Sequence, residues 1–150
     1  MQASWAECFH TAGALKSHSD VAVAARVMKV LGQSVADQIP YTDFQLSVES
    51  VLYDPSHHFA PTAAPTTLLL HQTGGILNSQ LLEIEDDPLL IVGGEYVLFL
   101  DEYAPGYYRV AGGPTGRFTV NAAGLVSPFV SDGVAFSGQV RDFQSVIAGA

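Results

Sequence analysis

The stretch Gly93-Gly94-Glu95-Tyr96-Val97-Leu98-Phe99-Leu100 decides the fold of this chain. Its glycine pair indicates a turn, and the apolar run that follows has the length and composition of a buried strand. After a short acidic turn, a second, aromatic strand is expected at Tyr107-Tyr108-Arg109-Val110. The glycine-rich corner Gly112-Gly113-Pro114-Thr115-Gly116 then leads into a third strand at Arg117-Phe118. Because turns this short join antiparallel neighbours, the stretch predicts an antiparallel β architecture.

Strand patterns continue on both sides of this stretch. Residues 21–30 open a strand whose first apolar side chains share one face, and a later change of phase indicates a β-bulge. Residues 41–51 alternate polar and apolar side chains, as a strand with one buried face does. Residues 66–72 are expected to form a strand that ends at Gly74-Gly75, and residues 76–84 another. With residues 125–130 the chain has roughly seven or eight strands, which predicts one β-barrel or, alternatively, a β-sandwich.

Two apolar segments flank these strands. Between about residues 4 and 18, apolar side chains recur at the spacing of a short helix, at Trp5, Cys8, Phe9, Ala12 and Leu15. Between about residues 138 and 148, the offsets of Val140, Phe143 and Ile147 suit a short amphipathic helix. We therefore expect a single domain over residues 1–150, with the barrel from about 20 to 130 and a short helix at each end.

The composition favours the burial of apolar surface. Of the 150 residues, 48% are hydrophobic and 14% are charged, against a usual charged share of about 25%. The excess apolar surface is expected in an unusually full core or in contacts between chains. The formal charge of −9 argues against nucleic-acid binding, which needs clustered Lys and Arg. No apolar run approaches the roughly 18 residues of a membrane-spanning helix, so no membrane span is predicted.

Cys8 is the single cysteine, so any disulfide would join two copies of the chain. Its neighbours Trp5 and Phe9 favour a buried apolar thiol instead. Met1 is followed by neither a basic segment nor a long apolar one, so no signal peptide is predicted. The alternatives are a cytoplasmic protein and a mature extracellular or cell-surface protein whose leader has been removed. Low lysine content and abundant small residues favour the exported one.

Several segments, in this order, resemble a known family. They are Asp20-Val21-Ala22-Val23, Arg26-Val27, Tyr41-Thr42-Asp43-Phe44 with the residues up to Val48, Val51-Leu52, Asp86-Asp87-Pro88, and residues 93–100 and 112–118. Together they resemble a widespread class of uncharacterised bacterial exported β-domains. The layout is similar to the netrin-like, tissue-inhibitor-of-metalloproteinase-like version of the OB barrel. Over about residues 21–130, the resemblance implies an OB-like antiparallel barrel.

The chain departs from the inhibitor family at its N-terminus. Members of that family begin with a cysteine whose amino group meets a metal, and their disulfides brace the barrel. Cys8 is internal and alone, so inhibition of metalloproteinases is not carried over to this chain.

Acidic residues crowd the region between 83 and 102, where the candidate Ca²⁺ ligands are Glu83, Glu85, Asp86 and Asp87. Ca²⁺ accepts such oxygens from flexible loops, although the segment lacks the glycine and the spaced acids of an EF-hand. No basic residue occurs between Lys29 and Arg109, so the region is also a candidate docking face for a basic protein. The alternative is a solubilising acidic rim around turns.

A second metal candidate is the pair His57 and His58, with His71 and Asp54 as further ligands. Adjacent histidines on an extended chain point to different sides, so the pair would not ordinarily bind one ion together. Three prolines lie between residues 54 and 65, and the alternative is a solvated proline-rich loop.

The sequence contains no recognisable catalytic constellation. No Gly-x-Ser-x-Gly turn occurs, and residues 112–116 lack the lysine of a phosphate-binding loop, which favours a β corner there. An aromatic, sugar-binding face is a further candidate, built from Tyr96, Tyr103, Tyr107 and Tyr108. Period two places Tyr107 and Tyr108 on opposite sides of a strand, so at least one of them is expected in the core or an interface. We expect no enzyme activity and no cofactor.

These observations favour a non-enzymatic exported or surface-associated domain that works through protein contacts and assembles with itself. The terminal segments supply the expected interface residues, which are Trp5, Cys8, Phe9, Val140, Phe143 and Ile147. The alternative function is a small binding module for Ca²⁺ or a basic protein through residues 83–102. A third hypothesis, an enzyme, would require a deep pocket that holds two carboxylates or a carboxylate with a histidine.

Overall fold

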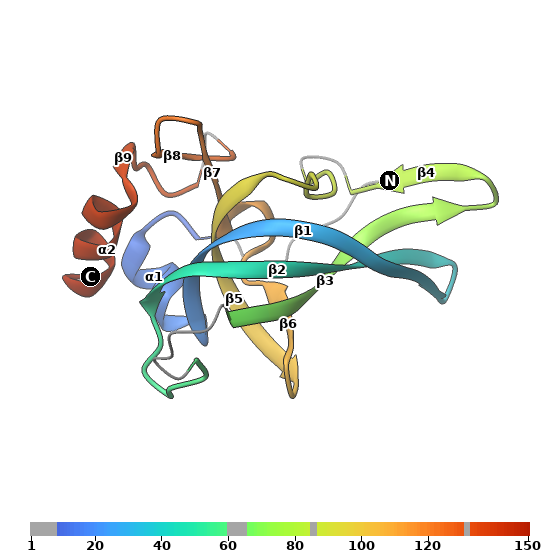
Figure 1. Ribbon diagram of the computed structural model, residues 1–150, viewed down its shortest axis with the longest axis horizontal. Coiled ribbons are helices and arrows are strands. Elements are labelled where there is room, and N and C mark those ends of the chain that lie inside the picture. The colour runs from blue at the N-terminus through green and yellow to red at the C-terminus, as the bar shows by residue number, and fades with distance from the viewer. Residues whose placement is uncertain (1–8, 60–65, 85–86, 131–132) are drawn as a thin grey trace.

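The chain folds mainly into β-strands. The computed structural model describes residues 9–59, 66–84, 87–130 and 133–150, and within these ranges nine strands join one sheet (Figure 1). The strands are β1 (Val21–Ala36), β2 (Ile39–Tyr53), β3 (Thr66–Leu77), β4 (Gln80–Glu83), β5 (Glu95–Ala104), β6 (Tyr107–Val110), β7 (Arg117–Val120), β8 (Leu125–Pro128) and β9 (Gly138–Gln139). The helices are α1 (Ala12–Ser17) and α2 (Val140–Ala148), with a 3-10 turn, η1 (Gly113–Gly116), between β6 and β7. The prediction of a mainly β protein with two short helices is confirmed.

Five of the strands close into a ring. β1 pairs with β2 on one edge and with β5 on the other, and the order between them is β2–β3–β6–β5. Neighbours in the ring are antiparallel except β3 and β6, which run parallel and share only two residue pairs, Leu69 with Tyr107 and Leu70 with Tyr108. The ring therefore has one short parallel seam.

β5 lies at the centre of the sheet, which explains its continuous apolar sequence. It pairs with β1 along one edge and with both β6 and β7 along the other. Val97, Leu98, Phe99 and Leu100 are all fully buried, because each face of β5 packs against a different apolar cluster. A strand covered on both faces needs no polar alternation.

Two apolar clusters form the core. The first fills the ring, where inward-facing side chains of all five strands meet, among them Val23, Phe44, Leu70, Leu98 and Tyr108. The second lies outside the ring, between β1, β5, β7 and the helices, and includes Leu15, Phe99, Phe118, Phe143 and Ile147. Figure 1 shows α1 and α2 side by side at this end of the molecule.

Local signals set the limits of the two helices. Thr11 caps α1, since its side-chain oxygen accepts a hydrogen bond from the Ala14 amide at 3.1 Å. The helix expected over about residues 4–18 thus begins at Ala12 among the described residues, and residues 1–8 lie outside them. In α2, Gln139 and Asp142 form a capping box, and Phe143 and Ile147 lie one turn apart on the buried face.

The glycine pair at 74–75 does not end a strand, contrary to the sequence-based expectation. β3 continues through Gly74 (φ 128°) and Gly75 (φ 151°) to Leu77, and the chain reverses only at Asn78 and Ser79. Both of these turn residues have positive φ, as a two-residue hairpin loop of the type I′ class requires. Residues 76–84 therefore belong to two strands. The glycines serve close packing instead, because a Cβ on Gly75 would lie 3.1 Å from Thr42 Oγ1.

Two hairpins extend beyond the ring, and both reach the same end of the molecule (Figure 1). We call the first, residues 28–41 of β1 and β2, the long arm, and the second, residues 73–82 of β3 and β4, the short arm. β1 has 16 residues and β2 has 15, whereas β5 covers only the first six residues of β1. The register of β1 shifts between Val27 and Lys29 and again between Val30 and Gly32, so the predicted change of phase is present as β-bulges.

The glycine-rich corner at 112–116 is a buried 3-10 turn. Gly112 adopts the left-handed conformation with φ 71°, and a Cβ on Gly116 would lie 1.9 Å from the Ala111 carbonyl oxygen. Thr115 Oγ1 accepts from the Phe9 amide at 3.2 Å and donates to the Gly112 carbonyl at 2.7 Å. The corner therefore anchors the start of the described chain against β7.

Candidate functional site

The arms carry an exposed apolar surface that we call the arm surface. On the long arm its members are Met28, Val30, Leu31, Val35 and Ile39, with exposed fractions from 36% to 53%. On the short arm they are Ile76 at 47% and Leu81 at 57%. Lys29 and Asp37 are the only charged residues in the long arm's sequence, and the short arm's sequence has none. This end of the molecule is therefore nearly neutral in a chain with a formal charge of −9.

The two arms are tied to each other. Thr42 Oγ1 donates to the Gly74 carbonyl at 2.8 Å, and Thr42 is buried. Further out, the Ile76 amide donates to Gln33 Oε1 at 3.3 Å. Gly75 lies where the arms approach most closely, since its missing Cβ would meet Thr42 and Pro40. The four strand segments that carry the arm surface are thus held together.

One edge of β1 is open along the long arm. Pairing with β5 ends at Arg26 with Glu95, and the last backbone contacts on that side join Val27 to Gly93 and Gly94 at 2.8 and 3.0 Å. Beyond Val27, no backbone of the described ranges pairs with this edge, while the other edge pairs with β2. An open, apolar strand edge is a ready template for another strand.

The acidic region predicted to bind Ca²⁺ is largely used within the chain. Asp87 is buried and its Oδ1 accepts a hydrogen bond from Arg117 Nη1 at 2.9 Å. Glu83 Oε2 accepts from the Leu89 amide at 2.6 Å. Glu85 and Asp86 lie outside the described residues. No group of three or more metal-binding side chains occurs among the residues that the structure describes.

Asp87 and Arg117 form an ion pair in which both side chains are mostly buried, at 12% and 4% exposed. Burial raises the pKa of the Asp87 carboxyl, against the opposing effect of the Arg117 guanidinium. Arg117 also donates to the Pro88 carbonyl and lies over the ring of Phe129 at 4.0 Å. These contacts tie the 87–88 segment to β7, which is a structural role.

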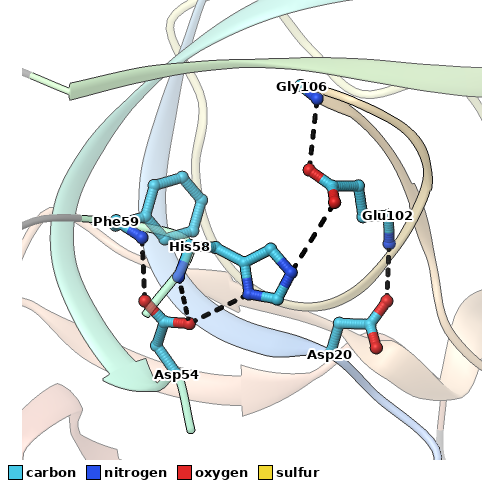
Figure 2. A network of polar contacts seen from close by, with 6 residues as sticks. All are labelled: Asp20, Asp54, His58, Phe59, Glu102 and Gly106. Atoms are coloured by element: carbon cyan, nitrogen blue, oxygen red, sulfur yellow. Dashed lines mark hydrogen bonds and ion pairs between the residues drawn. The ribbon is translucent and has the colours of Figure 1, made fainter. Parts of the chain in front are cut away.

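The histidine pair is divided by the fold. His57 has a positive φ of 56° and is exposed, whereas His58 lies in a polar network between the β2–β3 loop and β5 (Figure 2). His58 Nδ1 lies 3.1 Å from Asp54 Oδ1, and His58 Nε2 lies 3.7 Å from Glu102 Oε1. One imidazole ring thus faces two carboxylates, and in its protonated form it can donate to both.

The same network joins three parts of the chain. Asp54 accepts hydrogen bonds from the amides of His58 and Phe59, and Glu102 accepts one from the Gly106 amide in the β5–β6 turn (Figure 2). The Glu102 amide in turn donates to Asp20 Oδ2, just before β1. Burial alone would raise the pKa of Asp54. The hydrogen bonds from the Phe59 and His58 amides and from the His58 ring outweigh burial and lower the pKa. The network fixes the loop after β2 against the ring.

An aromatic row crosses the outer face of the ring. Tyr41 on β2 stacks on His71 of β3 with centroids 4.7 Å apart, and His71 lies 5.6 Å from Tyr103 of β5. Tyr107 of β6 follows at 6.2 Å from Tyr103. The predicted aromatic set is thus split, because Tyr96 and Tyr108 are buried while Tyr103 and Tyr107 are each 41% exposed. The period-two expectation for Tyr107 and Tyr108 is confirmed.

Sequence reasoning missed Tyr41 as a member of this row and Asp43 as its neighbour. Both occupy outward positions of β2, alternating with buried Thr42 and Phe44, so period two already indicated their face. Their proximity to His71 depends on the register of β2 with β3, where Asp43 is opposite His71. Nothing in the sequence specifies that register by itself.

The expected interface residues of the terminal segments lie mainly in the chain's own core. Phe143 and Ile147 are fully buried, and Phe9 is 8% exposed and stacks on His18. Val140 packs partly buried against the same cluster. Trp5 and Cys8 lie outside the described residues. The described exposed apolar surface is concentrated elsewhere, on the arms.

Neither protein-family models nor curated proteins match the chain. Within the described ranges, no helix has the length and apolar character needed to cross a membrane. Function is therefore inferred from the surfaces of this chain alone.

Proposed function

We propose that this protein is a non-enzymatic, exported or surface-associated domain that assembles with further copies of itself through its two arms. The observation that carries the proposal is the arm surface, which exposes seven large apolar side chains on hairpins that leave the ring. A two-stranded hairpin is marginal in water on its own, and here both faces of the long arm beyond Val27 are largely exposed. A second protein surface would bury these side chains.

Charge favours a second copy of this chain as the occupant. Two molecules with a formal charge of −9 repel each other, but the arms hold one lysine, one aspartate and no other charge. A basic partner would instead be drawn to the acids elsewhere on the protein, and it would gain little from a neutral apolar surface. The arms are thus the part of the molecule where two copies meet with least repulsion.

The open edge of β1 supplies the means of assembly. Antiparallel pairing of this edge with the same edge of a second copy would make a two-fold, self-complementary contact. With the pairing centred on Gln33, Leu31 of each copy would lie opposite Val35 of the other. Apolar pairs across strands stabilise such a sheet.

The fold part of the proposal is an OB-like barrel of the kind that the resembled exported domains have. The closed five-strand ring with its internal apolar cluster supports it. The calcium or basic-partner alternative has less support, because Glu83, Asp87 and Glu102 already accept hydrogen bonds within the chain.

The experiment is sedimentation or light scattering of the full chain from micromolar to near-millimolar concentration. We expect the mass to rise above the 15.9 kDa of one chain as concentration rises. Leu31→Lys, at 45% exposure on the β1 edge, should lower the association at least tenfold. Leu125→Lys is the matched control, because Leu125 on β8 is also 45% exposed and the charge change is the same. A monodisperse monomer at every concentration, or equal loss in both variants, overturns the proposal.

A further inference from the structure

A cavity of about 530 Å³ opens at the parallel seam of the ring, where it is lined by outward residues such as His71 and Arg109 and by the buried Gln72 and Asp87. Pairing between β3 and β6 stops after Leu70 and Tyr108, although both strands continue. His71 and Thr73 therefore form one wall, and Arg109 with Tyr103 forms the other. The long arm completes the rim with Ser34. The volume is within the range of about 300–1,000 Å³ that is usual for small-molecule sites.

The walls of this cavity are aromatic and only partly covered. Tyr41, His71 and Tyr103 line it, and the row continues outside it to Tyr107. Core packing does not explain the last two tyrosines, since each is 41% exposed and faces away from both apolar clusters. Tyr41 and His71 stack on each other, whereas Tyr103 is tilted by 50° from His71 and by 54° from Tyr107. Four rings from four strands thus form a row whose spacing is set by the pairing of the strands.

Polar groups surround the aromatic row and are held in place. His71 Nδ1 lies 2.6 Å from Asp43 Oδ1, so the carboxylate holds the imidazole ring in place. The Arg109 guanidinium lies over the Tyr103 ring at 4.5 Å. Hydroxyls of Ser34 and Thr73 line the opposite rim. Donors and acceptors are therefore mixed around aromatic faces.

We infer that this cavity binds a saccharide, with sugar rings against the aromatic row and hydroxyls hydrogen-bonded to the surrounding polar side chains. An apolar small molecule would leave those polar groups without water or partners, which is costly. A polyanion such as a nucleic acid or a sulfated glycan would meet a protein of formal charge −9 with a single arginine at the site. An uncharged saccharide can form hydrogen bonds with those polar groups and carries no charge that the protein would repel.

The saccharide site shares the arms with the proposed self-association, because Ser34 and Tyr41 lie on the long arm and Thr73 on the short arm, but none of its residues belongs to the arm surface. The test is isothermal titration of the full chain with four probes: a β-1,4-linked glucan hexamer, an α-1,4-linked glucan hexamer, an N-acetylglucosamine hexamer and heparin. We expect a micromolar to millimolar Kd for at least one of the three uncharged oligosaccharides and none for heparin. Tyr103→Ala and Tyr107→Ala should each weaken that binding at least tenfold.

Leu125→Ala is the control, because Leu125 on β8 is 45% exposed against 41% for each tyrosine, and its loss should leave the Kd unchanged. Circular dichroism of each variant separates loss of binding from loss of fold. As a second measurement on the wild type, amide shifts on titration should map to residues 71–73 and 107–110. The inference would be overturned if none of the three uncharged oligosaccharides bound or if heparin alone bound. Binding that both tyrosine variants retain would overturn it as well.

Discussion

Asp87 lies 2.9 Å from Arg117 in the interior of the protein, and the pair joins the acidic turn after β4 to the start of β7. One of the four candidate Ca²⁺ ligands is thus paired with a cation of the same chain. Its pKa is raised by burial, so the folded state holds the Asp87 proton more tightly than the unfolded state does. The free energy of unfolding contributed by Asp87 therefore falls as pH rises from its ordinary pKa to the raised one, and is constant above it.

Removing one member of this pair should be costly. Asp87→Ala leaves the Arg117 guanidinium buried without a counter-charge, and we expect the free energy of unfolding to fall by about 3–5 kcal/mol at pH 7 in urea titrations. The control is Glu49→Ala, which breaks the exposed ion pair with Arg26 at 3.5 Å and should cost at most about 1 kcal/mol. Equal, small losses in both variants would contradict a structural role for the buried pair.

Asp54 should stabilise the loop after β2 in a pH-dependent way. Asp54→Asn removes one of the two oxygens that accept from the Phe59 and His58 amides, and the loss should be about 1–3 kcal/mol at pH 7. Because folding lowers the pKa of Asp54, its stabilisation is present above the unfolded-state pKa and is lost as pH falls through the folded one. The difference between wild type and variant, measured by urea titration, should therefore shrink below about pH 4.

Ser56→Ala is the control for Asp54, because Ser56 is exposed in the same loop. A difference between wild type and Asp54→Asn that stays constant from pH 7 to pH 2 would show that the carboxylate charge has no part in fixing the loop.

The sequence predicts β5 well and the arms poorly, for physical reasons. An unbroken apolar run such as residues 96–100 is typical of a strand that is buried on both faces. Such a strand can be recognised without knowing which strands pair with it. The arm turns at residues 37–38 and 78–79 contain no glycine, although all four residues have positive φ. Turn chemistry therefore gives only the weaker signal of Asp37 and Asn78 there, while Gly74 and Gly75 give a false one.

The candidate sites depend even more on register. Asp87 and Arg117 are 30 residues apart, and the aromatic row joins residues of four strands whose pairing no local pattern specifies. Alternation shows which face each side chain occupies, as it does for Tyr107 and Tyr108. Alternation does not show which strand pairs with the one that carries the side chain.

Gly116 should tolerate no side chain. A Cβ there would lie 1.9 Å from the Ala111 carbonyl oxygen, which is backbone and cannot rotate away. We expect Gly116→Ala to lower the free energy of unfolding by about 1–3 kcal/mol or to prevent folding, as measured by thermal and urea unfolding. Gly13→Ala is the control, since its nearest neighbour would be 3.9 Å away and alanine favours the helix α1. An unchanged stability of Gly116→Ala would show that the corner has another shape.

Phe143 distinguishes a core role of α2 from an interface role. Its ring stacks on Phe136 with centroids 4.4 Å apart and meets Phe118 edge-on at 4.8 Å, and it is fully buried. Phe143→Ala should therefore cost about 3–5 kcal/mol in urea unfolding. At temperatures where the variant remains folded, its association constant should equal that of the wild type. Val146→Ala, on the exposed side of the same helix at 45%, should change neither quantity. If Phe143→Ala instead weakened association while leaving stability intact, the helix would belong to the interface, and assembly through the arms alone would be wrong.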